Sequence, residues 1–109
     1  MWNFLTPKGR KTTKAFLDHV VILAQNATDR LVDSTEGRVT EKEYLKNLIN
    51  RCQEYLKQDE WGLVIEELTE GLYEIEFKVD DKAIVLAKDS ILCCGMNYED
   101  RRYFEELAI

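Results

Sequence analysis

Hydrophobic residues recur at intervals of three and four along most of the chain, and this is the period of an amphipathic α-helix. The first such stripe follows Thr13 and contains Phe16, Leu17, Val20, Val21, Ala24, Ala27 and Leu31. The segment DSTEG at 33–37 interrupts the pattern with small polar residues and a glycine, which are typical of a loop. The sequence therefore predicts a first helix that starts near residue 13 and ends before residue 33.

The second predicted helix begins with a capping box. Thr40 is followed three residues later by Glu43. In this motif the Thr40 hydroxyl accepts a hydrogen bond from the backbone N–H of Glu43, and the Glu43 carboxylate accepts one from the backbone N–H of Thr40. The apolar stripe that follows contains Tyr44, Leu45, Leu48, Ile49, Cys52, Tyr55 and Leu56. Gln58 and Asp59 end this helix, and the side chain of Asp59 is expected to cap the next one.

The third predicted helix spans residues 60–76. Its apolar residues cover about a third of the helical circumference and are Trp61, Val64, Ile65, Leu68, Leu72 and Ile75. Trp61 is therefore expected to be a core residue. Gly62 and Gly71 also fall inside this helix, where each costs about 1 kcal/mol relative to alanine. Two such glycines indicate close packing against a neighbouring element, or local bending.

Asp80 is placed to cap a fourth helix, with Val79 and Ile84 as a hydrophobic staple across its first turn. The body of this helix, AIVLAKDSILCC at 83–94, is apolar nearly all round, which is typical of a central buried helix. The segment EIEFKV at 74–79 alternates as a strand would. A helix is preferred here because the sequence offers no evident partner strand.

A short fifth helix completes the predicted fold. Gly95 ends the fourth helix as the residue after its C-cap, and Asn97 caps the fifth. The residues expected to point inward from it are Tyr103, Phe104 and Leu107. At 109 residues the chain has the length of one domain with one core. Together these elements predict an all-α fold, a single-domain bundle of about five helices.

The first residues are predicted to lie outside this bundle. Residues 1–12 are expected to form an N-terminal arm, and 13–109 the helical domain. Up to residue 14 the chain has four bases and no acid. Because Trp2, Phe4 and Leu5 are too apolar to remain in water, the arm is expected to dock on the domain.

Composition and charge narrow the class of protein. Hydrophobic residues make up 45% of the chain and charged residues 33%, as in globular proteins. No apolar run approaches the roughly 20 residues that cross a bilayer, and residues 1–10 lack the apolar core of a secretory signal. We therefore expect a cytoplasmic protein without a membrane partner. The net charge of −6 opposes nucleic-acid binding and favours a basic partner, although acidity for solubility alone is the alternative.

Residues with catalytic or metal-binding chemistry are sparse. His19 is the only histidine, and Cys52, Cys93 and Cys94 are the only cysteines. These residues match no zinc or nucleophile–base pattern, and adjacent cysteines are poorly placed for an ordinary disulfide, so reduced thiols packed as small hydrophobic side chains are expected. Carboxylate pairs are common but lack the predicted burial that acid–base catalysis requires. We expect no enzymatic activity, no metal and no cofactor.

The strongest charge feature is an acidic segment at 58–81. It contains one basic residue, Lys78, and nine acidic residues, which gives a local net charge of −8. The acidic residues are Asp59, Glu60, Glu66, Glu67, Glu70, Glu74, Glu76, Asp80 and Asp81. They are not interleaved with lysines at helical spacing, as a merely solubilising face would be. We therefore expect them to be unpaired within the chain and to contact a basic protein surface. The alternative is a solvated acidic face without a partner.

The stretch CQEYLKQDEWGLVIEELTEGLYE, residues 52–74, resembles the signature segment of MafI/CdiI-type immunity proteins. The shared pattern is a helix that ends in a turn, then Glu-Trp-Gly, then a helix with paired acids and Leu-Tyr-Glu. The matching residues are Leu56, Asp59, Glu60, Trp61, Gly62, Glu66, Glu67, Leu68, Leu72, Tyr73 and Glu74. The resemblance extends over residues 40–107, and the N-terminal arm and the adjacent cysteines depart from it.

The resemblance implies a small helical bacterial protein that neutralises a cognate toxin domain. Toxins of this class include RNases, among them EndoU-type enzymes, whose substrate clefts are basic. An acidic helix can occupy such a cleft, because its carboxylates pair with arginine or lysine. The predicted contacts, in a complex of one immunity protein with one toxin domain, are Asp59, Glu66, Glu67, Glu70 and Glu74. The alternative is a small helical adaptor or subunit of a cytoplasmic assembly, paired through its apolar fourth helix.

Overall fold

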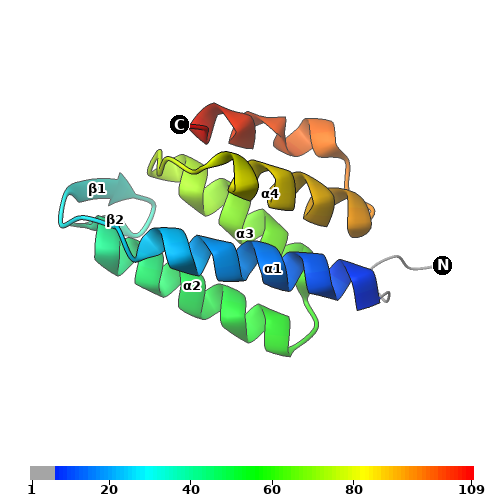
Figure 1. The fold of residues 1–109 in the computed structure, drawn as a ribbon. Helices are drawn as coiled ribbons and strands as arrows, with labels where there is room; N and C mark the ends of the chain where they lie inside the picture. The colour runs from blue at the N-terminus through cyan, green and yellow to red at the C-terminus, as the bar shows by residue number, and fades with distance from the viewer. Residues whose placement is uncertain (1–6) are drawn as a thin grey trace.

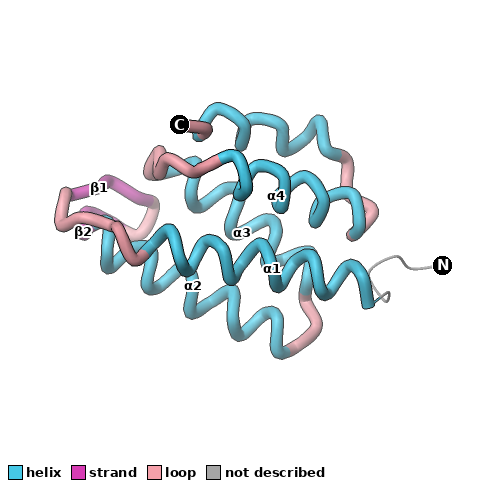
Figure 2. Tube along the Cα trace, in the orientation of Figure 1, coloured by secondary structure: helices cyan, strands magenta, loops and turns pink. Residues whose placement is uncertain are grey.

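Four α-helices, a short β-hairpin and a C-terminal 3-10 helix make up the fold, and the computed structural model describes residues 7–109. The elements in chain order are α1 (Pro7–Ala24), β1 (Leu31–Ser34), β2 (Gly37–Thr40), α2 (Glu41–Lys57), α3 (Trp61–Glu74), α4 (Asp81–Cys93) and η2 (Tyr98–Leu107). Within this part of the chain the predicted all-α bundle of five helices is confirmed, and Figure 2 shows how little of it is strand. The expected docking of Trp2, Phe4 and Leu5 concerns positions outside the described residues.

Helix α3 is the centre of the bundle, because it packs against α1, α2, α4 and η2 (Figure 1). Its apolar stripe is buried as predicted, and Val64, Ile65, Leu68 and Leu72 are fully inaccessible to solvent. The prediction that α4 is the central helix is wrong. Val85 and Leu92 of α4 are 57% and 53% exposed, because α4 packs mainly on α1 and leaves one face uncovered.

The boundaries of α1 differ from the prediction. The helix begins at Pro7 instead of residue 13, so half of the predicted arm is its first turns. Proline suits the first turn of a helix because it has no N–H group to leave unpaired. At the other end the helix stops at Ala24, and the predicted Leu31 belongs to strand β1.

The β-hairpin was not predicted. Strands β1 and β2 pair antiparallel, with Leu31 opposite Thr40 and Ser34 opposite Gly37. Gly37 has a φ of +108°, which favours glycine in the turn. Each strand has only four residues, which is too short for a clear alternation of apolar and polar side chains. The sequence of this segment therefore indicated only a loop.

The predicted helix ends are confirmed at four positions. Thr40, Asp80 and Asn97 each accept a backbone N–H in the first turn of α2, α4 and η2, at 3.0–3.1 Å. Gly95 follows the C-cap of α4 with a φ of +74°. These four residues therefore determine where the helices end and where the short loops of the bundle begin.

A hydrogen bond between His19 and Asp80 joins α1 to the start of α4. His19, which the hydrophobic period placed off the apolar stripe, is only 9% exposed. Its Nε2 lies 2.8 and 3.0 Å from the two carboxylate oxygens of Asp80. Because Asp80 also accepts the N–H of Ala83 at 3.0 Å, one carboxylate caps α4 and binds it to α1.

We expect acid to weaken this link. The hydrogen bond with His19, and then that from Ala83, hold the pKa of Asp80 below its ordinary value. Its contribution to the free energy of unfolding is therefore full above the ordinary pKa of aspartate and is lost as the pH falls through the lowered value. Asp80→Asn retains the cap and loses the charge. In urea unfolding followed by circular dichroism down to about pH 3, the variant should lose less stability than the wild type.

Asp80→Ala is the control, because it removes the cap as well and should cost about 1 kcal/mol more at neutral pH. Equal acid dependence of the wild type and Asp80→Asn would contradict the role of this pair.

Candidate functional site

The five predicted contact residues divide between two hollows beside α3. Glu67, Glu70 and Glu74 line a hollow between α2 and α3, here called the acidic hollow. Asp59 and Glu66 line a second hollow where α2 turns into α3, here called the α2–α3 corner. The structure thus gathers the five carboxylates along one helix but in two separate groups.

The acidic hollow has a volume of about 370 Å³. Its lining comes from the hairpin turn, α2 and α3, and consists of Thr35, Glu36, Tyr44, Arg51, Tyr55, Glu67, Glu70, Gly71 and Glu74. Four glutamates surround one arginine, which leaves a net charge of −3. Glu36 was missed because it lies in the hairpin turn, 31 residues before Glu67 in the sequence.

Arg51 holds two of these carboxylates. Its Nε and Nη2 lie 3.2 Å from Glu67, and its Nη1 lies 3.2 Å from Glu36. Partial burial by itself lowers the pKa of Arg51, but the hydrogen bond and charge of Glu67, with Glu36, raise it overall. The guanidinium therefore stays charged and ties the hairpin turn to α3 through α2.

Glu74 is also committed within the fold. One oxygen accepts the backbone N–H of Thr35 at 2.6 Å, and the other lies 3.1 Å from the hydroxyl of Tyr44. That hydroxyl also lies 2.9 Å from the carbonyl of Gly71. Burial and the neighbouring carboxylate of Glu74 raise the pKa of Tyr44, which therefore stays neutral. Glu74 thus attaches the hairpin turn to α3.

Arg101 of η2 binds the outer carboxylates of α3. Its guanidinium lies 2.9 Å from Glu70 and 3.9 Å from Glu66, and its side chain is only 15% exposed. Glu70 remains 59% exposed beside it. Arg101 lies 31 residues after Glu70 in the sequence, so helical spacing within α3 gave no sign of this contact.

The α2–α3 corner is a hollow of about 340 Å³. Asp59 was predicted to cap α3 but does not, because its φ of +59° turns the chain and its carboxylate pairs with Arg10 of α1. Glu60 takes the cap position instead, without a side-chain hydrogen bond to the helix. The remaining lining residues are Trp61, Gly62, Leu63, Glu66 and Cys94. Trp61 is buried as predicted.

For the five predicted contact residues, the expectation that the acids are unpaired is therefore wrong. Each of the five predicted contacts has a partner within the fold, and the arginines involved are Arg10, Arg51 and Arg101. The two hollows together contain seven carboxylates, and these three arginines offset three of the negative charges, which leaves a net charge of −4. The surface is acidic, but its charges are ordered by the protein itself.

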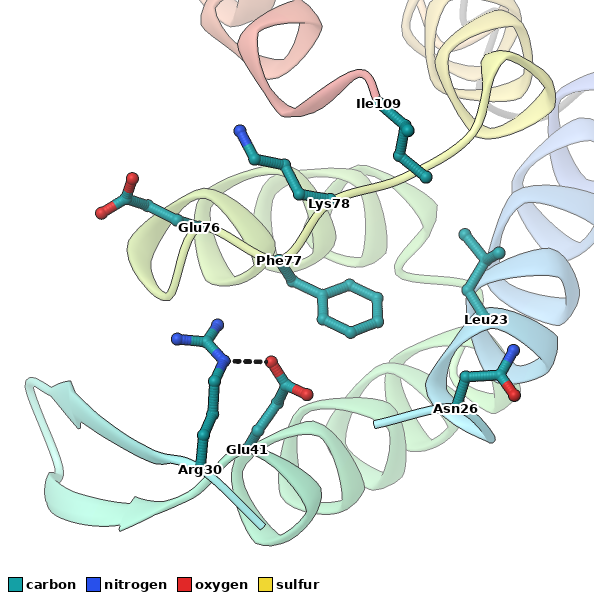
Figure 3. Close-up of a pocket in the computed structure, with 8 residues that line it drawn as sticks. All are labelled: Leu23, Asn26, Arg30, Glu41, Glu76, Phe77, Lys78 and Ile109. Carbon is teal, nitrogen blue, oxygen red and sulfur yellow. Dashed lines mark hydrogen bonds and ion pairs between the residues drawn. The ribbon is translucent and has the colours of Figure 1, made fainter. Parts of the chain in front are cut away.

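A third hollow, of about 540 Å³, lies between the end of α1, the start of α2 and the loop before α4 (Figure 3). Burial alone would raise the pKa of Glu41, but hydrogen bonds from the amide of Thr28 and from Arg30 lower it. Arg30 also donates to the carbonyl of Ile75 at 2.8 Å. Glu76 and Lys78 balance the remaining charge, so this hollow does not favour a strongly charged partner.

Other chemical groups add little to the site. Burial raises the pKa of the Cys52 thiol to about 12, which excludes it as a nucleophile at neutral pH. Within residues 7–109 no group of three or more histidine, cysteine, aspartate or glutamate side chains is arranged to hold a metal. In the same region no helix is long and apolar enough to cross a membrane.

Comparisons with known proteins identify no relative of this chain. No family model matches the chain, and searches of curated proteins and of solved structures found no significant match.

The attachment of the hairpin turn to α3 is directly testable. We expect Glu74→Ala to speed hydrogen exchange of the Thr35 amide about tenfold or more, because a hydrogen bond to a charged group contributes about 1.5–3 kcal/mol. Glu70→Ala is the matched control, since Glu70 pairs with Arg101 and makes no hydrogen bond to the hairpin. Residue-resolved NMR exchange measures both, and unchanged exchange at Thr35 in Glu74→Ala would contradict the attachment.

Proposed function

We propose that this protein is a cytoplasmic immunity protein that binds and neutralises a basic, nuclease-type toxin domain through the acidic surface of α3. The observation that supports it is the net charge of −4 that remains over the acidic hollow and the α2–α3 corner after the internal arginines are counted. A nuclease binds phosphates through arginine and lysine, and the same side chains bind carboxylates.

Internal pairing leaves these carboxylates able to bind a partner. A carboxylate has about four lone-pair sites, and Glu70 uses one of them for Arg101 while its side chain remains 59% exposed. Holding the side chains in place before binding reduces the entropy lost on association. An incoming arginine thus extends an existing network of charges and does not need to break it.

Complementary charge contributes more to the association rate and the specificity of binding than to its affinity. Affinity in protein interfaces comes mostly from a few aromatic or arginine anchors at the centre of the contact. Tyr73 of α3 is a suitable anchor because it is 38% exposed and packs edge-on against Tyr103, with ring centres 4.8 Å apart. It lies one residue from Glu74, so an anchor and the acidic surface share one helix.

Neutralising the acidic hollow tests the proposal. The variant Glu67→Gln/Glu70→Gln/Glu74→Gln keeps the side-chain shapes and removes three negative charges. We expect association with the toxin domain to slow about tenfold or more at low salt, with a smaller effect at high salt, because salt screens the attraction. The first step is to inspect the neighbouring reading frame. If it encodes a large secreted protein with a basic C-terminal domain, that domain is the partner to measure, by stopped-flow binding and by growth protection.

The control variant removes three exposed acids elsewhere, Glu43→Gln/Asp89→Asn/Asp100→Asn, and so makes the same change in net charge. Equal association rates for the two variants, or full protection by the first, would remove the acidic hollow from the interface. Absence of any binding by the wild type would contradict the immunity function itself.

A second candidate function is a subunit of a larger cytoplasmic assembly. Val85 and Leu92 are seven residues apart on α4 and therefore share one face, and Ile22 on the neighbouring α1 is 56% exposed. Exposed apolar residues on two adjacent helices are the feature that favours it.

Sedimentation equilibrium separates the two functions. The immunity function predicts a monomer at micromolar concentration. A stable oligomer in the wild type that becomes monomeric in Val85→Lys/Leu92→Lys would favour the subunit. Asn47→Lys/Asn50→Lys, at two exposed positions of α2, makes the same net change of +2 away from α4 and is the control for altered charge.

A further inference from the structure

Gly62 lies in the first turn of α3 without a packing reason. A β-carbon built at this position meets nothing within 4 Å, so alanine would fit there and would favour the helix. Gly71 is different, because a β-carbon there would lie 2.9 Å from Leu48. A glycine that the fold does not require leaves bare backbone open to a group that approaches from outside.

Unused hydrogen-bond donors lie at the same place. The first amide of α3 with an acceptor is that of Val64, which donates to the Glu60 carbonyl at 3.2 Å. The amides before it have no acceptor among the described residues, because the Glu60 side chain does not cap the helix. Trp61 also lines this hollow and is 94% buried, and its indole Nε1 has no hydrogen-bond partner in the described part of the chain. An unpaired buried donor lowers stability, and an acceptor that binds there would recover this loss.

The same hollow presents three carboxylates, those of Asp59, Glu60 and Glu66. Arg10 occupies Asp59, and Arg101 reaches Glu66 only at 3.9 Å, while Glu60 makes no ion pair within residues 7–109. A free anion would be repelled by these carboxylates, and a free cation would leave the N–H donors unpaired. A peptide segment with a basic side chain satisfies both, because its main-chain carbonyl accepts hydrogen bonds.

We propose that the α2–α3 corner is a docking site for a basic loop of a protein partner. The loop places an arginine or lysine against Glu60 and Glu66, and a main-chain carbonyl against the N–H donors at the start of α3. Gly62 lets the main chain of the loop approach, and Leu63, which is 36% exposed, contacts the aliphatic part of the basic side chain. This inference rests on the proposed function and names the part of the toxin domain that would contact the corner.

An arginine peptide tests the site without the toxin. Titration of the ¹⁵N-labelled protein with acetyl-Gly-Arg-Gly-amide should shift the NMR signals of the Trp61 indole N–H and the Gly62 amide. The same peptide with citrulline, which is neutral and nearly the same shape, should shift them much less. Equal shifts with both peptides, or none at these two groups, would overturn the site.

Gly62→Leu provides the second test, because it fills the hollow where the structure has free space and should leave the free energy of unfolding equal or higher. We expect it to abolish the peptide shifts and to weaken binding of the toxin domain about tenfold or more. Asn47→Leu, an exposed leucine on α2, is the matched control.

These variants separate the two proposals. If the triple glutamine variant weakens toxin binding and Gly62→Leu does not, the proposed function stands and the corner site is wrong. If no toxin domain binds but the arginine peptide binds wild type and not Gly62→Leu, the corner site stands and the immunity function is wrong.

Discussion

The close approach of α2 and α3 at Gly71 is the contact on which the rest of the surface depends. Leu48 of α2 packs where a β-carbon of residue 71 would lie, and the hydroxyl of Tyr44 reaches the Gly71 carbonyl. This distance between the helices also sets how far Arg51 must reach to Glu67. A larger residue at 71 would separate the helices and the charged groups together, so the core and the acidic hollow are built by one contact.

The arginines resolve a conflict created by the acids. Carboxylates placed this densely on one helix repel each other and lower its stability. Arg10, Arg51 and Arg101 come from three different elements, α1, α2 and η2, and each crosses to the acids of α3 or of the turn before it. Because three positive charges meet seven negative ones, the fold gains order without losing the acidic character of the surface. Stability and attraction of a basic partner are therefore compatible here.

Local signals in the sequence predicted the features that depend on local contacts. The caps at Thr40 and Asp80 and the buried stripe of α3 follow from residues a few positions apart. The pairing of Arg101 with Glu70 spans 31 residues, so it depends on where η2 packs, which no spacing within one helix reveals. The exposed face of α4 was missed for the same reason. The apolar sequence of α4 predicts burial, but the neighbouring helices decide which of its faces is covered, and Val85 remains exposed to solvent.

The two glycines of α3 show what helical geometry predicts beyond the apolar stripe. Gly62 and Gly71 are nine residues apart, which is about two and a half turns, so they point to opposite sides of the helix. Both therefore cannot pack against one neighbouring helix, and a single explanation of close packing had to fail for one of them. The structure decides it: Gly71 meets Leu48, and Gly62 faces free space beside the carboxylates of the corner. A residue that weakens a helix and contacts nothing in the fold is best explained by a contact made outside it.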